Sequence, residues 1–498
     1  MAKTIMIQGT MSNAGKSVIT AGLCRIFRQD GYSVAPFKSQ NMALNSFITR
    51  DGLEMGRAQV VQAEAAGIEP SVLMNPILLK PVADMGSQVI VNGEVIGNMG
   101  AADYFAFKKT LIPKIMRAFE MLSAQHDIIV IEGAGSPAEI NLKAEDIVNM
   151  GLAKMTRTPV LMVGDIDRGG VFAQLVGTLM LLNDDEHDMV KGLVINKFRG
   201  DLEILRPGLT LLEEKCGKPV AGVVSYMSVD IEDEDSLTER FHKKETGAAL
   251  DIAVIRLPKI SNFTDFMALE ATVGVGLRYA ENVRSLGRPD MVIIPGTKNT
   301  ISDMKWLRES GLEGAVLKLA EKDVVVFGLC GGYQMLGRSI RDTENTEGGG
   351  EISGMGLLPM HTEFHTEKTR LRVTGKITGA QGVLTPLNNQ EVEGYEIHMG
   401  VSYPDEEHSA SLLVKDGGGT DGCAAGNIAG TYMHGFFDSA PCRTALISAL
   451  CSQKGIALPD ESAFVFDAYK NEQFDILAKG VRESLDMNLV YRILEEGI

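Results

Sequence analysis

The chain opens with TIMIQGTMSNAGKSVI, residues 4 to 19, and this stretch decides the fold of its first half. A short apolar run, TIMIQG, leads into a loop that ends in Gly15-Lys16-Ser17, and helical spacing begins near Val18. In a strand, loop and helix of this kind, backbone N–H groups and the helix dipole face a phosphate. Lys16 would reach the outer phosphates and Ser17 would ligate Mg²⁺. The stretch therefore predicts a nucleotide phosphate site at the start of a parallel sheet.

The loop departs in one respect from the usual phosphate-binding pattern. Five residues, not four, separate Gly9 from Gly15, and Thr10 stands where the first glycine would fall. In this respect the loop resembles that of dethiobiotin synthetase and related ATP-dependent enzymes that activate carboxylates. The resemblance implies that the following residues bind ATP: Thr10, Asn13, Gly15, Lys16 and Ser17. The alternative is a chance Gly-Lys-Ser at a helix cap.

Apolar runs rich in Ile and Val, including the one before the phosphate loop, predict the strands of this sheet. They lie at residues 4–9, 127–135, 159–165 and 191–198, and helical patterns separate them. The clearest of these patterns, residues 171–182, places one apolar stripe at helical spacing. Continuous apolar strands that alternate with helices indicate a parallel sheet covered on both faces.

Three polar segments follow strands of this sheet, at the edge where such folds bind ligands. Glu132 could hold Mg²⁺ directly or through water, or be a solvated carboxylate. Asn196, in NKFRGD, could bond a nucleotide base edge or belong to an ordinary turn. Lys38 could meet the carboxylate or phosphoryl group being activated, or be a solvated lysine.

Composition limits the classes of function. The chain has 498 residues, 45% of them hydrophobic and 23% charged, which is typical of a soluble globular protein of two to four domains. Its formal charge of -17, without a Lys/Arg block, argues against nucleic-acid or membrane-surface partners and favours small molecules. The 6 cysteines form no CxxC pair, and no long apolar stretch or signal-peptide core occurs. We therefore expect a cytoplasmic protein.

A second series of apolar runs begins after a charged stretch. Residues 228–249 are charged, lack a strand pattern and predict a surface linker. New strand patterns follow at residues 251–258, 290–299 and 323–332, and the glycine-rich stretches 347–350 and 417–419 predict hairpins or exposed loops. The expected organisation is two α/β domains, residues 1–235 and 250–445, and a helical tail, residues 446–498, that could pack on either domain.

A candidate nucleophile lies in the second domain. Cys330 follows a buried strand pattern in GLCGGYQMLG, where a sharp turn into a helix exposes a side chain and favours the thiolate. The N–H of Gly331 could help to form an oxyanion hole, with a second donor at Gly296 or Thr297. The expected base is His434, in TYMHGFFD. The alternative is that Cys330 is only a small core residue.

This Cys-His pattern resembles the class I glutamine amidotransferases, which release ammonia from glutamine. Phe436 occupies the place of the carboxylate that usually follows the histidine by two residues, and this is similar to the subgroup in corrinoid biosynthesis. The acid that would orient His434 is left open, with Asp438 and Glu396 as candidates. The flanking GYEIHMG is also similar to that subgroup, and we expect no catalytic role for His398.

The two domains together resemble the glutamine-dependent amidotransferase family of cobalamin biosynthesis. The strings that carry this resemblance are GTMSNAGKS, KSQNMALNS, IEGAGSPAEINL, GDIDRGGVFAQ, NKFRGD, PGTKNT, GLCGGYQMLG and GYEIHMG. The resemblance implies use of ATP, Mg²⁺ and glutamine to amidate the b, d, e and g carboxylates of adenosylcobyrinic acid a,c-diamide, giving adenosylcobyric acid. Open alternatives are an a,c-diamide synthase that acts on cobyrinic acid and a regulatory P-loop ATPase with an inactive glutaminase domain. The corrinoid pocket, the order of amidations, the ammonia route and the oligomeric state do not follow from the sequence.

Overall fold

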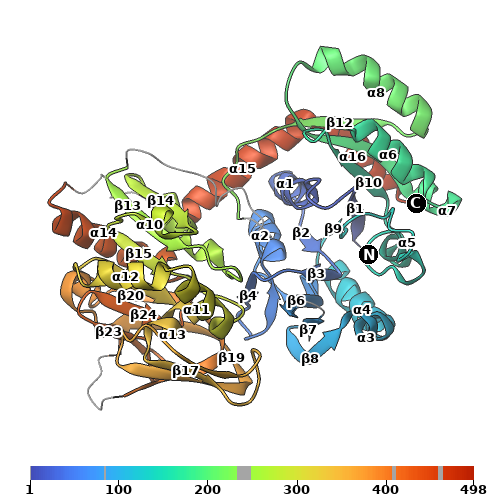
Figure 1. The fold of residues 1–498 in the computed structure, drawn as a ribbon. Helices are drawn as coiled ribbons and strands as arrows, with labels where there is room; N and C mark the ends of the chain where they lie inside the picture. The colour runs from blue at the N-terminus through green and yellow to red at the C-terminus, as the bar shows by residue number, and fades with distance from the viewer. Residues whose placement is uncertain (1, 84–85, 233–247, 406–410, 458–463) are drawn as a thin grey trace. The chain divides into compact units, whose positions relative to one another are not determined.

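The structure is a computed structural model that describes residues 2–83, 86–232, 248–405, 411–457 and 464–498 (Figure 1). The chain divides into two compact units, each with its own sheets. The first unit comprises Met1–Ala43, Glu54–Glu234 and Ala468–Ile498, and the second comprises Leu44–Leu53 and Asp235–Asp467. Most of the predicted linker, residues 233–247, lies outside the described residues.

The first unit is built on a sheet of six parallel strands in the order β12-β11-β10-β1-β9-β2. The predicted strand runs are four of these strands. The bounds are β1 Lys3–Gly9, β2 Val34–Phe37, β9 Ile128–Glu132, β10 Val160–Asp165, β11 Val190–Phe198 and β12 Val220–Ser225. Every residue of β9 and β10 is buried, because helices cover both faces of the sheet. The predicted parallel sheet is confirmed.

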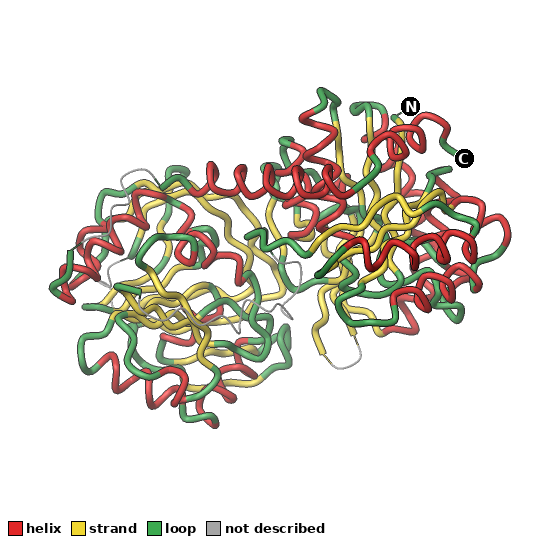
Figure 2. The backbone as a smooth tube through the Cα atoms, turned by 90° about the horizontal axis from the view of Figure 1, so that it is seen from above, coloured by secondary structure: helices red, strands yellow, loops and turns green. Residues whose placement is uncertain are grey.

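Helices on both sides of this sheet connect its strands, as the two views show (Figure 1 and Figure 2). The predicted helix 171–182 is observed as α6, Val171–Met180. The remaining bounds are α1 Lys16–Gln29, α2 Arg57–Ala66, α4 Ile112–Ser123, α5 Met150–Thr156, α7 Asp184–Met189 and α8 Leu202–Cys216. A smaller sheet has the strand order β3-β6-β7-β8, and helix α3, Ala101–Phe107, follows its last strand in the sequence. The strand bounds are β3 Gln40–Met42, β6 Ile77–Ala83, β7 Gly86–Val91 and β8 Glu94–Gly100.

The end of the chain completes the core of the first unit. Helix α15, Phe466–Ser484, places Leu477 and Val481 in the same buried cluster as the side chains of α1. A Cβ at Gly22 of α1 would lie 2.8 Å from Val481, so the two helices approach closely because position 22 has no side chain. The final helix, α16, covers Met487–Glu496 and adds buried residues to that cluster.

The second unit has a sheet in the order β14-β13-β15-β16-β24-β23, parallel except for β23. Its strands are β13 Leu250–Ile255, β14 Val275–Ala280, β15 Met291–Ile294, β16 Val325–Leu329, β23 Cys423–Ala425 and β24 Ile428–Thr431. Its helices are α9 Met267–Glu270, α10 Val283–Leu286, α11 Thr300–Glu309, α12 Leu312–Ala320, α13 Gly331–Leu336 and α14 Ala440–Lys454. The predicted second α/β region is confirmed.

A mostly antiparallel sheet, which the sequence analysis did not predict, completes this unit. Its central pair is β19, Met360–Ile377, against β20, Glu391–Pro404. The flanking strands are β17 Ser339–Asp342, β18 Gly350–Ser353, β21 Leu413–Lys415 and β22 Thr420–Asp421. The two glycine-rich stretches lie at the turns of the β17–β18 and β21–β22 hairpins, as expected.

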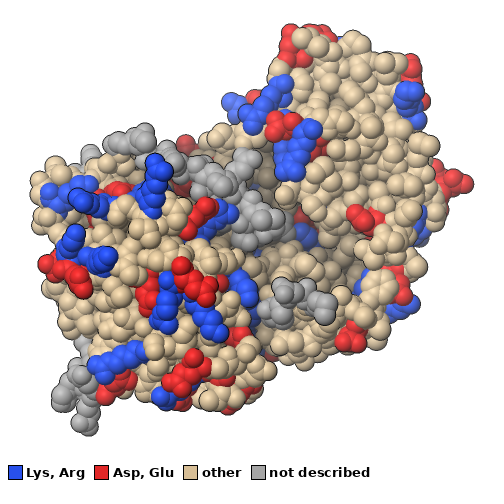
Figure 3. Space-filling model, in the orientation of Figure 1, with Lys and Arg blue, Asp and Glu red and all other residues tan. Residues whose placement is uncertain are grey.

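Charged side chains of both signs lie side by side on the face of the second unit drawn in Figure 3. Surface ion pairs of the second unit include Arg308 with Glu313 and Arg341 with Glu351. Pairs of this kind contribute about 0–1 kcal/mol each. The cores, and not these pairs, therefore supply most of the stability. Among the described residues, no helix is both long and apolar enough to cross a membrane.

Candidate functional site

The phosphate loop lies between β1 and α1, as predicted. Gly15 caps the helix with φ of 97°, a conformation that favours glycine. The Asn196 side chain donates to the carbonyl of Ala14 at 2.9 Å, and a Cβ at position 15 would lie 1.9 Å from the Asn196 amide nitrogen. Gly15 is therefore required both by the backbone turn and by the close approach of Asn196.

Two neighbouring cations hold the loop in shape. Lys16 Nζ donates to the carbonyls of Met11 and Gly135, both at 3.0 Å. Lys197, next to Asn196, donates to the carbonyl of Asn13 at 2.7 Å and to Asp165 at 2.8 Å. The structure thus places Asn196 against the loop backbone, and its contact with a nucleotide base stays a prediction.

A second part of the loop faces α6. Thr10 Oγ1 donates to Gln174 Oε1 at 3.2 Å, and the Thr10 N–H donates to the carbonyl of Val163 on β10. Thr10, which replaces the usual first glycine, is therefore hydrogen-bonded to both β10 and α6.

Glu132 is the centre of a buried polar cluster beside the loop. It ends β9 and is 1% exposed. Its Oε1 accepts from Ser17 Oγ at 2.9 Å and from Lys38 Nζ at 2.8 Å, and its Oε2 accepts from Gln62. The structure thus brings together the predicted Ser17, Lys38 and Glu132, which are far apart in the sequence.

Gln62 and its neighbours were missed by the sequence analysis. Gln62 and Gln59 lie on α2, and Asn41 donates to Gln59 Oε1 at 3.1 Å. Gln62 Oε1 and Gln59 Nε2 are buried and find no hydrogen-bond partner within the part of the chain that the structure describes. Glutamine pairs at helical spacing are common on any helix, so the sequence alone gives no signal for this role.

The oxygen atoms of this cluster suit a hard divalent cation. Mg²⁺ in nucleotide sites is held by one or two carboxylate or hydroxyl oxygens together with substrate phosphates and water. Glu132 and Ser17 supply such oxygens within 2.9 Å of each other, at the end of the phosphate loop. These residues fit the ion that the sequence analysis assigned to them.

Cys330 occupies a strained turn between β16 and α13. Its backbone has φ of 51° and ψ of −110°, a conformation that few residues with side chains adopt. A Cβ at Gly332 would lie 1.9 Å from the carbonyl of Ile294, so only glycine fits there. The Cys330 Sγ lies 3.7 Å from the carbonyl of Ile397 on β20. This is the elbow expected of a nucleophile.

Asp265 is the acid whose side chain contacts the His434 ring. Its Oδ2 lies 2.7 Å from His434 Nδ1, and its Oδ1 accepts from the N–H of Gly435 at 3.0 Å. His434 is 1% exposed and Asp265 is 4% exposed. Neither of the proposed acids makes this contact: Glu396 pairs with Lys415 at 2.6 Å, and Asp438 is exposed.

The sequence held only a weak signal for Asp265. It lies in a short 3-10 turn, Phe263–Phe266, after β13, and is separated from His434 by 169 residues. A polar residue soon after a parallel strand is compatible with a site, but no family string covers it.

Charge interactions make His434 an unusually strong base for a buried histidine. Burial alone lowers its pKa, but the Asp265 carboxylate and a hydrogen bond with Cys330 raise the pKa to about 10. The imidazolium form is therefore stabilised between a carboxylate and the cysteine sulfur. A histidine that is hydrogen-bonded to a cysteine and oriented by a carboxylate is the arrangement that activates a nucleophile in covalent catalysis.

The two predicted oxyanion-hole turns face the Cys330–His434 pair. A Cβ on Gly331 would lie 3.2 Å from the N of Thr297, and one on Gly296 would lie 3.3 Å from His434 Cε1. The backbone after β15 thus approaches both Gly331 and His434. Donation by Gly331, Gly296 or Thr297 to an oxyanion stays a prediction.

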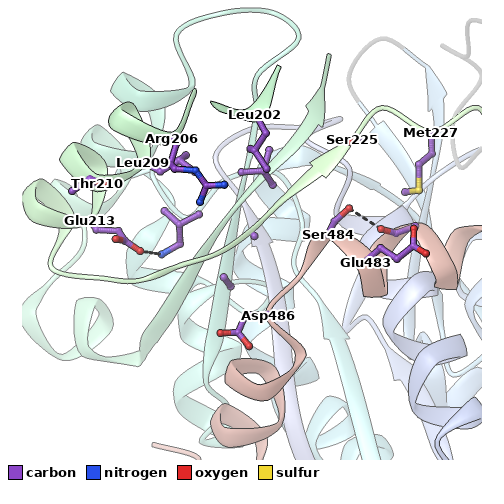
Figure 4. Close-up of a pocket in the computed structure, with 15 residues that line it drawn as sticks. Leu202, Arg206, Leu209, Thr210, Glu213, Ser225, Met227, Glu483, Ser484 and Asp486 are labelled. Atoms are coloured by element: carbon purple, nitrogen blue, oxygen red, sulfur yellow. Dashed lines mark hydrogen bonds between the residues drawn. The ribbon is translucent and has the colours of Figure 1, made fainter. Parts of the chain in front are cut away.

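A pocket of about 660 Å³ lies elsewhere in the first unit (Figure 4). Leu202, Arg206 and Glu213 of α8 line one side, and Glu483, Ser484 and Asp486 near the end of α15 line another. Two of the lining elements, α8 and β12, are hydrogen-bonded to each other, since Glu213 accepts from the N–H of Val220 at 2.7 Å. No predicted site residue is among those that line it.

Comparisons with known proteins identify a family for each half of the chain. Residues 5–237 match the CobQ/CobB/MinD/ParA nucleotide binding domain family, and residues 251–442 match the CobB/CobQ-like glutamine amidotransferase domain family. The chain is 57% identical to the cobyric acid synthase of Lachnoclostridium phytofermentans, over 100% of both chains. It is 57% identical to that of Ruminiclostridium cellulolyticum, over 100% of this chain and 98% of the relative. It is 51% identical to that of Clostridium acetobutylicum, over 98% of both chains.

Proposed function

The chain belongs to the cobyric acid synthase family, and we propose the residues with which it carries out the reaction of that family. It is an ATP-dependent, glutamine-hydrolysing amidotransferase that acts in cobalamin biosynthesis on a corrinoid. We further propose that the acceptors are the b, d, e and g carboxylates of adenosylcobyrinic acid a,c-diamide and that the product is adenosylcobyric acid. The observation that carries the residue assignment is the buried Asp265–His434–Cys330 arrangement in a chain that also contains the phosphate loop.

The first half-reaction activates a carboxylate. An oxygen of the corrinoid carboxylate attacks the γ-phosphorus of ATP, and the bond between that phosphorus and the β-phosphate oxygen breaks. ADP departs, and the carboxylate becomes an acyl phosphate. Lys16 lies at the loop and neutralises charge on the transferring phosphoryl group. Lys38 is placed beside Glu132 to meet the carboxylate or the phosphoryl group. Ser17 and Glu132 would hold Mg²⁺, which offsets negative charge on the phosphates.

The second half-reaction releases ammonia. The Cys330 thiolate attacks the amide carbon of glutamine, and Gly331 and Gly296 donate N–H groups to the developing oxyanion. His434 gives its proton to the leaving nitrogen, and Asp265 keeps the ring oriented while its charge changes. Water then hydrolyses the thioester to glutamate and frees Cys330. Ammonia attacks the acyl phosphate, phosphate leaves, and the amide is formed.

The two-site assignment is tested by Cys330→Ala. This variant should lose glutamine-dependent amidation by about 10³-fold or more, while amidation driven by ammonium salt stays within about twofold of the parent. The ammonia assay is best run above about pH 8, where more ammonium is free base. Mass spectrometry of the corrinoid product counts the amides formed and distinguishes this activity from a,c-diamide synthesis.

Cys442→Ala is the matched control. Cys442 is also a buried thiol of the second unit, and its Sγ contacts the carbonyl of Glu391 at 3.5 Å. Its loss should leave the ratio of the two activities unchanged. An unchanged ratio in Cys330→Ala as well, at matched folded fraction, would refute the role of Cys330 and favour a regulatory ATPase with an inactive glutaminase domain.

A further inference from the structure

Ten residues from the first half of the sequence belong to the second unit. We call Leu44–Leu53 the inserted segment, because the chain before and after it belongs to the first unit. Its strand β4, Ser46–Ile48, packs against β19 and β20. Ile48 is fully buried and shares a small apolar cluster with Tyr395 and Ile397 of β20. The segment is therefore an integral part of the unit that carries Cys330 and His434.

The inserted segment makes a set of buried hydrogen bonds with Asn262 and Tyr395. The Asn262 N–H donates to Asn45 Oδ1 at 2.8 Å, and the Ser46 N–H donates to Asn262 Oδ1 at 3.3 Å. The Tyr395 hydroxyl donates to the carbonyl of Ser46 and accepts from Asn262 Nδ2, both at 3.2 Å. All of these residues are less than 5% exposed, so each bond is costly to lose.

Tyr395 contacts the catalytic histidine on its other side. Its ring stacks on His434 with centroids 5.2 Å apart and an interplanar angle of 23°. The two backbones also pair, since Tyr395 N donates to the carbonyl of His434 at 3.1 Å and His434 N donates to that of Tyr395 at 2.8 Å. A Cβ at Gly394 would lie 2.1 Å from the His434 carbonyl, so the glycine before Tyr395 permits this approach.

Asn262 is connected in the same way to the acid. It starts the short turn that carries Asp265, and the N–H of Asp265 donates to its carbonyl at 3.1 Å. Asn262 has φ of 51°, a conformation that Asn tolerates better than most residues. Its side chain is therefore fixed by the inserted segment while its backbone fixes the turn of Asp265. Both residues that the segment binds are one contact away from the His434–Asp265 pair.

We infer that the inserted segment is a positioning element of the glutaminase, and that Asn262 and Tyr395 are positioning residues through which it orients Asp265 and His434. This inference rests on the proposed function of Cys330 and His434. Stacking and backbone pairing restrict the imidazole on one side, and the Asn262 turn restricts the carboxylate on the other. Small misplacements of such groups reduce the rate strongly, because the proton transfers need a fixed geometry.

The inserted segment also gives the glutaminase a covalent connection to the ATP site. Lys38 lies six residues before Leu44, and Gln62 lies nine residues after Leu53. Both side chains bind Glu132, the carboxylate beside the phosphate loop. The glutaminase geometry is therefore completed by a segment that the ATP-binding half of the sequence supplies.

Tyr395→Phe in the full-length enzyme tests the inference. It removes the two hydroxyl bonds and keeps the stacked ring, so the kcat for glutamine hydrolysis should fall about tenfold with little change in the KM for glutamine. Amidation driven by ammonium salt should stay within about twofold of the parent. Alkylation of Cys330 by iodoacetamide at a fixed pH should be slower than in the parent, because a less well oriented histidine activates the nucleophile less.

Tyr403→Phe is the control for this substitution. Tyr403 lies on the same strand, stacks on His361 at 5.7 Å and places its hydroxyl 3.4 Å from His365. Its variant should leave kcat and the alkylation profile as in the parent. Asn45→Ala, a change within the inserted segment itself, removes the acceptor of the Asn262 N–H and should act in the same direction as Tyr395→Phe.

The outcomes separate this inference from the proposed function. If Tyr395→Phe and Asn45→Ala keep the parental kcat and alkylation profile, the inference is refuted, whatever Cys330→Ala shows. Equal losses of glutamine-driven and ammonia-driven activity would also refute it, because they indicate a general structural defect. Retention of glutamine-dependent activity in Cys330→Ala would instead refute the proposed function itself.

Discussion

The phosphate site and the glutaminase site differ in how far apart their parts lie along the chain. The phosphate loop is contiguous, from Gly9 to Ser17, and adds a few side chains such as Glu132. The glutaminase takes Asp265, Cys330 and His434 from three separate places, and residues of the inserted segment from a fourth. The comparison teaches that a backbone-built anion site can be encoded locally, whereas a proton-transfer site is assembled by the fold.

Lys16→Ala should have the largest effect and should lower the rate of amidation with both nitrogen sources, glutamine and ammonia. The substitution removes the cation from the phosphate loop, so amidation with glutamine and with ammonia should each fall by about 10³-fold or more. Steady-state rates of ADP release and amide formation measure this. Lys197→Ala, which removes a neighbouring cation that supports the loop, should cost far less. Parental ammonia-driven turnover in Lys16→Ala would show that the local site does not activate the carboxylate.

Asp265→Asn should have the next largest effect, and this effect should be confined to the glutaminase site. Loss of the carboxylate that orients His434 should lower the kcat for glutamine hydrolysis by about 10²-fold or more, with the KM for glutamine and the ammonia-driven rate little changed. The rate at which iodoacetamide alkylates Cys330 at a fixed pH should fall in parallel, a change that a merely structural role would not cause.

Asp438→Asn is the comparison variant for that experiment, because Asp438 is an exposed acid close to His434 in the sequence. It should retain most of the glutaminase activity. If Asp438→Asn lost as much activity as Asp265→Asn, the contact seen between Asp265 and His434 would not be the functional one.

The smallest expected effect is a pH dependence of stability that belongs to the glutaminase unit. The folded state raises the pKa of His434 to about 10, above the ordinary histidine value of 6.5. The interaction with Asp265 therefore stabilises the fold fully below about pH 6.5 and is lost as the pH rises through about 10. The parent should exceed Asp265→Asn in unfolding free energy by about 1.5–3 kcal/mol at pH 6, and by less as the pH approaches 10.

The chain is well suited to this measurement because its single tryptophan, Trp306, lies on α11 of the second unit. Urea unfolding followed by tryptophan fluorescence therefore reports that unit. A difference between the two proteins that stays constant from pH 6 to pH 10 would contradict the assigned ion pair.

The sequence by itself predicted the phosphate loop, the cysteine elbow, four of the six strands of the first sheet and three of the six strands of the second. Each of these depends on residues close together in the chain: apolar runs of strand length, Gly15-Lys16-Ser17 before a helix, and Cys330 between a strand and small residues. It also placed Glu132 and Lys38 near the phosphate site, because parallel strands deliver their carboxyl ends to one edge. His434 was named as the base without a place in the sheet. The β19–β20 hairpin was missed because its faces alternate only in part between buried and exposed residues.

Only the tertiary structure decided which side chains meet. Asp265 replaced Asp438 and Glu396 as the acid because a turn after β13 lies against His434, whereas Glu396 is bound by Lys415. Gln62 reached Glu132 from a helix, and the inserted segment joined the second unit through contacts that span 216 to 349 residues of sequence. Such pairings are fixed by the packing of distant elements, whose hydrogen bonds form only after burial. No local sequence pattern predicts these pairings.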